Sequence, residues 1–317
     1  MLRVVLLLLL TAPSLAEAKV NLLRHKAVTV RGFLETPSYA VSLDSRISSS
    51  KVRWEPNLRA LSGVDFSIRG FLGFGYGFIG NEDPQARDKN GRTTYSDYRL
   101  GATFPSWQLT GNLQTYRGLF ISNSSDVDPS YAGSSVNIQD PTFQVQNLSV
   151  NFTYIFDPDS FSLQAAIDQS ARQEESGGSW LAGLATSDTR LISDRQLIPT
   201  AAQSGYGSDG PIRSAHFDTF TVKGGYGYTI AWTPNFFTSV LLNIGIGYGR
   251  KEYDNGTQYK TGSFTASKGD ALFSIGYNSD SFIASLVAIV DSYTFSTDFI
   301  NLPTSLVSSK LAIGTHF

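Results

Sequence analysis

The sequence predicts an all-β protein, a transmembrane up-and-down antiparallel β-barrel of about twelve strands. Three observations support this fold class. Apolar and polar residues alternate along most of the chain, which is the period of a strand and not of a helix. Charged residues make up only 16% of the 317 residues, whereas soluble domains have about 25%. Aromatic residues reach 13% and gather beside short turns, where a membrane barrel carries its interfacial girdle.

Residues 236–248 illustrate the alternation. The even positions include Phe236, Leu242 and Ile244, whereas the odd positions include Asn243 and Gly245. A soluble sandwich would bury the apolar face, and a membrane barrel would turn it toward lipid. The polar faces carry few charges, although water-facing surfaces are usually about 25–35% charged. This favours the membrane barrel, with an exported soluble β-protein as the alternative.

Twelve segments carry the alternation. They are 38–46, 58–68, 70–80, 93–104, 106–119, 142–156, 160–170, 214–232, 235–250, 259–277, 280–295 and 303–317. Short turns and longer connectors alternate between them, and outer-membrane barrels place short turns in the periplasm and long loops outside. Both chain ends are therefore expected in the periplasm. We interpret residues 180–192 as part of one large external loop, 171–213, but counting them differently leaves ten or fourteen strands open.

The first residues have the layout of a secretory signal peptide. Arg3 provides a positive start, residues 4–10 are apolar, and Ala16-Glu17-Ala18 is a small-x-small cleavage signal. The apolar run is too short for a spanning helix, which needs about 20 residues. We therefore expect a signal peptide at 1–18 that is cleaved after Ala18, a periplasmic segment at 19–37 and the barrel at 38–317, in a bacterial outer membrane.

The inward faces of the expected strands carry both signs of charge. The predicted lumen-lining residues are Asp44, Arg46, Arg59, Asp65, Asp97, Arg99, Asp168, Lys223, Lys260, Lys268 and Asp270. A twelve-strand barrel lies between the filled eight-strand case and the open sixteen-strand porins. These charges therefore either pair across the lumen and close it, or line a narrow pore.

Aromatic residues flank the short turns. The predicted interfacial aromatics are Phe104, Trp107, Phe156, Phe161, Trp232, Phe236, Tyr277 and Phe282. The last strand alternates up to a terminal Phe317, which resembles the C-terminal assembly signal of bacterial outer-membrane barrels. That resemblance implies the barrel assembly machinery as a partner, in addition to outer-membrane lipid.

Several kinds of chemistry have little support. The chain has no Cys, and its net charge of −2 argues against a generally basic nucleic-acid binder. His216 and Asp218 share a strand face near the outer rim, where His216 could act as a general base. No Gly-x-Ser-x-Gly elbow accompanies them, and Asp126 and Asp128 are too few ligands for calcium. We predict no catalytic residue, no metal and no cofactor.

A series of short motifs resembles a known family. They are Ile68-Arg69-Gly70, Asp97-Tyr98-Arg99-Leu100, Gln114-Thr115-Tyr116-Arg117-Gly118-Leu119-Phe120, Ser176-Gly177-Gly178-Ser179-Trp180 and Gly224-Gly225-Tyr226-Gly227-Tyr228-Thr229. Each is short, but in this order they resemble the family of domain of unknown function 4421, found in Gram-negative envelopes. The resemblance covers most of residues 50–250 and implies location and fold, not an activity.

Three functional hypotheses follow. The first is a non-enzymatic narrow pore or transport barrel for small polar solutes. The second is a structural or surface-recognition barrel that acts through external loops 120–141 and 171–213. The third is an outer-membrane lipid hydrolase that uses His216. The sequence does not indicate the solute or the oligomeric state.

Overall fold

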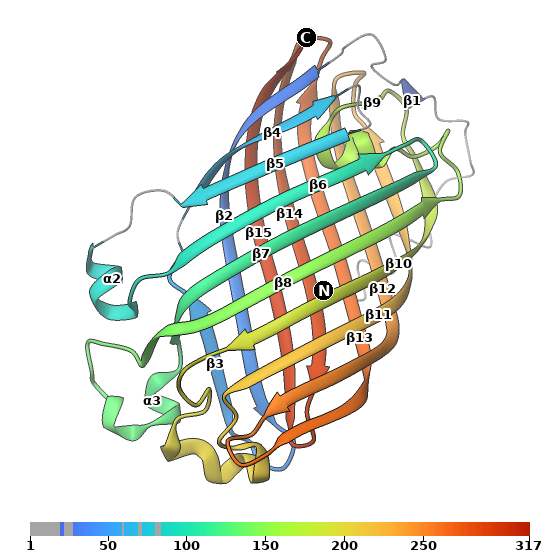
Figure 1. The fold of residues 1–317 in the computed structure, drawn as a ribbon. Helices are drawn as coiled ribbons and strands as arrows, with labels where there is room; N and C mark the ends of the chain where they lie inside the picture. The colour runs from blue at the N-terminus through green and yellow to red at the C-terminus, as the bar shows by residue number, and fades with distance from the viewer. Residues whose placement is uncertain (1–19, 22–27, 59, 69–71, 80–83) are drawn as a thin grey trace.

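A computed structural model describes residues 20–21, 28–58, 60–68, 72–79 and 84–317. One antiparallel sheet of thirteen strands closes on itself by pairing its last strand with its first (Figure 1). In the described residues, no helix has the length and apolar character needed to cross a membrane. The predicted transmembrane β-barrel is confirmed, and the expected signal peptide at 1–18 lies outside the described residues.

The wall strands are long and tilted. They are β2 (Val28–Ser45), β3 (Lys51–Pro56), β4 (Leu61–Ile68), β5 (Leu72–Ile79), β6 (Thr94–Thr103), β7 (Trp107–Ile121), β8 (Gln139–Ile155), β10 (Gly177–Ile192), β11 (Ser214–Ala231), β12 (Phe236–Asp254), β13 (Tyr259–Asn278), β14 (Phe282–Ser296) and β15 (Ile300–His316). A separate pair joins β1 (Val20–Asn21) to β9 (Arg172–Gln173). The helical elements are α2 (Pro84–Asn90), α3 (Ser124–Val127), η1 (Pro129–Tyr131), η2 (Gln164–Asp168) and η3 (Thr200–Asp209).

The wall changes its strand number along its length. β3 and β4 both pair with the same side of β2, so they occupy one position that is interrupted near Asn57. At one end β3 pairs directly with β7, whereas at the other end β4, β5 and β6 lie between β2 and β7. The barrel therefore has twelve strands at the end with the short turns and two fewer at the end with the long loops.

The barrel begins earlier than expected. Residues 28–37 were assigned to a periplasmic segment, but they form the first half of β2 and pair with β15 and β4. This half of the strand carries the charged residues Arg31 and Glu35, whose side chains point into the barrel, where they have ionic partners. The chain ends close beside this start, because Phe317 N donates to Val28 O at 2.8 Å.

One expected strand is wrong and another takes its place. Residues 160–170 alternate in sequence but form a buried segment with the π-helical turn η2. Residues 177–192, expected in an external loop, form the wall strand β10 between β8 and β11. Residues 160–170 are buried by the surrounding wall and do not pair as a strand, despite their alternating sequence. The large external loop is therefore 193–213, and the parity of the barrel is preserved.

The apolar side chains of the middle of the wall point outward. Leu242, Ile244 and Phe74 are 39%, 72% and 48% exposed, whereas Lys223 and Asp97 are 7% and 1% exposed. This is the arrangement of a barrel surrounded by lipid. It reverses the arrangement of a soluble β-sandwich, whose apolar face would be buried.

Candidate functional site

An apolar cap closes the barrel interior at the end with the long loops. Inward side chains such as Trp54, Phe143, Phe217 and Phe295 pack there in one cluster. The loop 193–213 inserts into this cluster with four apolar side chains, Leu197, Ile198, Tyr206 and Ile212. Trp54 Nε1 donates to Leu197 O, and Tyr206 Oη donates to Leu43 O, each at 2.8 Å. We call this loop and its apolar contacts the outer cap.

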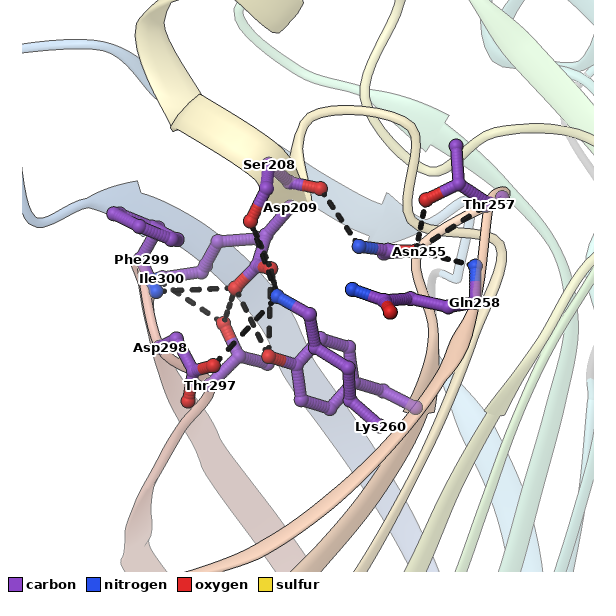
Figure 2. Close-up of polar contacts among 12 residues, drawn as sticks. Ser208, Asp209, Asn255, Thr257, Gln258, Lys260, Thr297, Asp298, Phe299 and Ile300 are labelled. Carbon is purple, nitrogen blue, oxygen red and sulfur yellow. Dashed lines mark hydrogen bonds and ion pairs between the residues drawn. The ribbon is translucent and has the colours of Figure 1, made fainter.

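A buried carboxylate fastens the outer cap to the strands around it. Figure 2 shows Asp209, at the end of η3, surrounded by donors from the β14–β15 loop and from β13. Its Oδ2 accepts from Thr297 Oγ1 at 2.7 Å and from Phe299 N at 3.0 Å, and Lys260 Nζ lies 3.2 Å from its Oδ1. Asp209 is fully buried, so these donors replace the water that an ionised carboxylate requires.

A second carboxylate extends this cluster toward solvent. Asp298 Oδ1 lies 2.7 Å from Lys251 Nζ, and its Oδ2 lies 3.6 Å from Lys260 Nζ. The hydrogen bond from Lys251 keeps the pKa of the Asp298 carboxyl below its ordinary value. On the other side of the cap, Asn255 Nδ2 donates to Ser208 O at 3.0 Å (Figure 2). The outer cap is thus held by charge as well as by apolar packing.

A second segment closes the barrel at the opposite end. Residues 160–171 fold into the lumen, where Phe161, Leu163 and Ala166 pack against inward wall residues such as Leu241 and Leu272. We call these residues the inner plug. Phe161 is fully buried, so its predicted place in the interfacial girdle is wrong. The alternation that placed it outward belongs to a segment that does not pair as a strand.

Polar contacts from the wall hold the inner plug in position. Gln169 Oε1 accepts from Arg31 Nη1 at 2.8 Å and from Ser285 Oγ at 3.0 Å. Asn278 Nδ2 donates to the backbone oxygens of Gln169 and Ala171 at 3.0 and 2.8 Å. Gln169 has a φ of +53°, a left-handed conformation that persists in a non-glycine residue only where its surroundings enforce it.

A polar chamber of about 350 Å³ lies in the barrel interior. One charged network lines it from β2, β4, β6 and β15. Asp65 lies 3.1 Å from Arg31 and also contacts Lys310, and Arg99 lies 3.0 Å from Glu35 and is bonded to Asp97. Three acids and three bases therefore neutralise each other.

A second charged network lines the chamber from β11, β13 and β14. Lys268 lies 2.7 Å from both Asp270 and Asp291, and Lys223 lies 3.2 Å from Asp270. Two acids and two bases again balance. Because unpaired buried charges are expensive, this pairing allows charged residues to face a small chamber.

The chamber wall formed by β7 and β8 is different. Its side chains form four directly opposed cross-strand pairs of amides and hydroxyls: Gln108–Thr153, Thr110–Asn151, Asn112–Ser149 and Gln114–Asn147. We call these eight residues the amide–hydroxyl strip. All of them are uncharged and able to form hydrogen bonds. The chamber therefore has one charged wall and one neutral polar wall.

The structure places most of the predicted lumen residues inside the barrel. Asp65, Asp97, Arg99, Asp168, Lys223, Lys268 and Asp270 face the interior, with Asp168 on the inner plug. Asp44 pairs with Lys51 at the outer rim, Arg46 is exposed at that rim, and Lys260 belongs to the outer cap. These three do not line the chamber. Arg59 lies outside the described residues.

Sequence reasoning missed four charged residues of the chamber: Arg31, Glu35, Asp291 and Lys310. The first two fell in the segment that was assigned to the periplasm. Leu311 and Ile313 are apolar residues of the outward face, so the strand period places the neighbouring Lys310 on the inward face. In the same way, the apolar Val290 places Asp291 on the inward face.

The remaining predicted aromatics lie on the outer surface. Phe156, Trp232, Phe236 and Phe282 are exposed, and Phe104, Trp107 and Tyr277 are half-buried beside them. Phe104 stacks on Trp107, and Phe236 packs edge-on against Tyr277. Their position beside the short turns fits an interfacial girdle, and their depth in a membrane stays a prediction.

The histidines occupy different environments. His316 is buried and its ring lies 2.9 Å from Thr29 Oγ1 and 3.0 Å from Asn278 Oδ1, and His25 lies outside the described residues. His216 Nε2 lies 3.0 Å from Asp188 and 3.3 Å from Asp218. These three alternate in phase with the exposed Phe220 and Val222, so they face outward. His216 is therefore remote from the chamber.

The chain matches a known family model. The model of the family described as domain of unknown function (DUF4421) matches residues 23–317. No curated protein sequence matches the chain.

Three solved structures are similar in fold. The outer membrane protease OmpT from Escherichia coli has a TM-score of 0.40 and 8% identity, covering 92% of this chain and 97% of that chain. The COG4313 outer membrane channel from Pseudomonas putida F1 has a TM-score of 0.36 and 9% identity, covering 92% and 96%. The toluene transporter TodX of P. putida has a TM-score of 0.29 and 7% identity, covering 92% and 90%. At these identities the likeness concerns the fold alone.

Proposed function

Because the chain belongs to the family described as domain of unknown function DUF4421, we propose a function from the geometry of the barrel interior. The protein is a non-enzymatic, gated narrow pore of the bacterial outer membrane that passes small polar solutes. The observation that carries this proposal is the polar chamber of about 350 Å³, which lies between two closures that each include a loop segment packed among inward wall side chains. The structure then corresponds to a closed state of the pore.

The nature of the two closures supports a gate. A barrel that serves only as a support can fill its interior with wall side chains, as eight-strand barrels do. Here the wall strands leave a chamber, and each closure includes a loop segment, 193–213 in the outer cap and 160–171 in the inner plug, that can leave the lumen without breaking the wall ladder. The inner plug is held by the packing of Phe161, Leu163 and Ala166 and by hydrogen bonds, which contribute only about 1 kcal/mol each. The outer cap buries more apolar surface and is therefore the harder gate.

Wall register allows each closure to be removed by design. Ile155 pairs with Leu181, so a two-residue Asn-Gly turn in place of 159–177 would join β8 directly to β10. Ile192 pairs with Ser214, so a similar turn in place of 194–212 would join β10 to β11. We call these the plug deletion and the cap deletion.

Planar-bilayer conductance tests the proposal. We expect wild-type protein to show brief openings, each single deletion to open more often, and the double deletion to conduct steadily. Heat-modifiable migration on gels would verify that each variant has formed a barrel. A wild-type barrel that never conducts at any voltage, together with a folded double deletion that also fails to conduct, would exclude the pore.

A second candidate function is surface recognition through the external loops. The observation that favours it is the anchoring of these loops in the apolar cluster of the cap, to which α3 contributes Val127 and loop 193–213 contributes Tyr206. Loops held in this way present a fixed surface. The cap deletion should then abolish adhesion or partner capture by whole cells while leaving barrel assembly intact.

The hydrolase hypothesis has less support. His216 contacts carboxylates on the outward face of the wall, and the chamber lies on the other side of that wall. A lipid hydrolase that depends on this residue would lose activity in His216→Ala.

A further inference from the structure

Some of the hydrogen-bonding groups that line the chamber already have partners among the described residues, and others do not. In the charged networks, the amines and guanidinium groups lie about 3 Å from carboxylates. Within the amide–hydroxyl strip, Gln108 is bonded to Thr103, and Asn147 accepts from Thr189. The other six side chains form no side-chain hydrogen bond with any residue in the described part of the chain: Thr110, Asn112, Gln114, Ser149, Asn151 and Thr153.

Polar groups in a protein interior are almost always hydrogen-bonded to protein or to water. Ser149 and Thr153 are 5% and 6% exposed and Gln114 is 8% exposed, so these groups have little access to bulk solvent. They are arranged in a regular array, because side chains on one strand face repeat about every 6.8 Å and opposed pairs lie about 5 Å apart. The strip therefore offers a fixed set of donors and acceptors to whatever occupies the chamber.

The charged wall restricts the occupant's charge. An ionic solute would have to give up its hydration in a chamber whose five cationic side chains already lie against carboxylates and whose further carboxylate, Asp168, accepts hydrogen bonds from Ser170. An uncharged solute with many hydroxyl groups makes no such demand, because each hydroxyl both donates and accepts. A volume of about 350 Å³ is at the small end of ligand sites.

We propose that the amide–hydroxyl strip is a binding site for a small uncharged polyhydroxyl solute, of the size of a monosaccharide or sugar alcohol. The strip supplies the hydrogen bonds, and the opposing ion pairs exclude charged relatives of the same size. This inference rests on the proposed pore and names the class of solute that the pore selects.

Saturation-transfer NMR on the full mature barrel in detergent tests the site directly. The probes are glucose, its cationic relative glucosamine and its anionic relative gluconate. Both the wild type and the plug deletion are measured, since the deletion gives the probes free access. We expect glucose to bind and both charged relatives to bind at least about tenfold more weakly, because a missing or unmatched hydrogen bond in a buried site costs about that factor.

Variants locate the binding on the strip. Asn112→Leu replaces the amide by an apolar side chain with the same number of heavy atoms, and Ser149→Ala removes a single hydroxyl. The Ser149→Ala variant remains informative if Asn112→Leu does not fold. Each should weaken glucose binding by about tenfold or less. The matched control is Asn301→Leu, which makes the same change at an exposed position of β15 outside the chamber. It should leave glucose binding unchanged.

The outcomes separate this inference from the proposed pore. Tighter binding of a charged probe, an equal loss in Asn301→Leu, or no glucose binding by a conducting protein would overturn the polyhydroxyl site and leave the pore standing. Glucose binding that depends on the strip in a barrel that never conducts would overturn the pore and leave the site.

Discussion

At the scale of single residues, charge pairing decides which side chains can face the chamber. Lys268 is 5% exposed and lies 2.7 Å from both Asp270 and Asp291. It thus separates two carboxylates that would otherwise repel each other at a directly opposed cross-strand position. Removing one member of such a group leaves an uncompensated buried charge, which costs more than the pair contributes.

We expect Lys268→Met to lower the free energy of unfolding by about 3–5 kcal/mol, because two carboxylates then remain without their shared cation. Lys51→Met is the control, since Lys51 is half exposed at the rim and surface pairs contribute about 0–1 kcal/mol. Urea unfolding in detergent, followed by tryptophan fluorescence, measures both. Equal effects in the two variants would show that the Lys268 network is not a buried, coupled unit.

The strand period identifies inward residues but not their partners. Arg31 pairs with Asp65 because β2 and β4 bring them directly opposite each other. That register depends on the interruption between β3 and β4 and on the true start of β2, and neither shows in the local sequence. Lys223 and Asp270 lie on strands separated by β12. The long side chain of Lys223 and the short side chain of Asp270 together span the width of β12.

At the scale of elements, the outer cap depends on one loop carboxylate. We expect Asp209→Ala to expose loop 193–213 to trypsin, with cuts at Arg195 or Arg213, because the variant loses the bonds to Thr297, Phe299 and Lys260. The loss should favour local opening by about 3–5 kcal/mol. The control Asp194→Ala, an exposed carboxylate in the same loop, should remain resistant. Resistance in both variants would mean that apolar packing alone holds the cap.

The cap should also loosen in acid. The pKa of Asp298 is lowered in the folded protein by Lys251, so its contribution is complete above the ordinary carboxyl value of about 3.9. It is lost as the pH falls through the lower folded value. Peptic cutting of the loop should therefore rise only below about pH 4. In Asp298→Asn this part of the pH dependence should disappear; if it persists unchanged, another group controls the cap.

Alternation is a reliable guide to elements only where a segment pairs with neighbours on both sides. It correctly indicated β11 to β15, which form long uninterrupted ladders. It failed at 160–170, which is buried inside the lumen without pairing as a wall strand, and at 177–192, where β10 carries Asp188 and Arg190 on its outward face near the rim. Neither the inner plug nor the strip's uncommitted groups is visible in sequence, because both depend on which strands face each other.

At the scale of the whole molecule, the barrel combines an apolar exterior with an interior whose charges are largely paired. The exterior belt fixes it in a membrane, and the closed ring leaves no strand edge free to associate. The chamber lies between two closures, each made of a loop segment packed among inward wall side chains. We also propose that the terminal strand, which ends in the exposed Phe317, is the part contacted by the assembly machinery.

The most direct test of this account compares two adjacent residues of β12. The chain has no native cysteine, so Ile244→Cys and Asn243→Cys can each carry a small trifluoromethyl label that reports by fluorine NMR. With the barrel in a lipid bilayer, nitroxide-bearing lipids should broaden the signal at 244 much more strongly than the signal at 243. Equal broadening at both positions, or broadening only at 243, would contradict a barrel with its apolar face in lipid and its polar face enclosed.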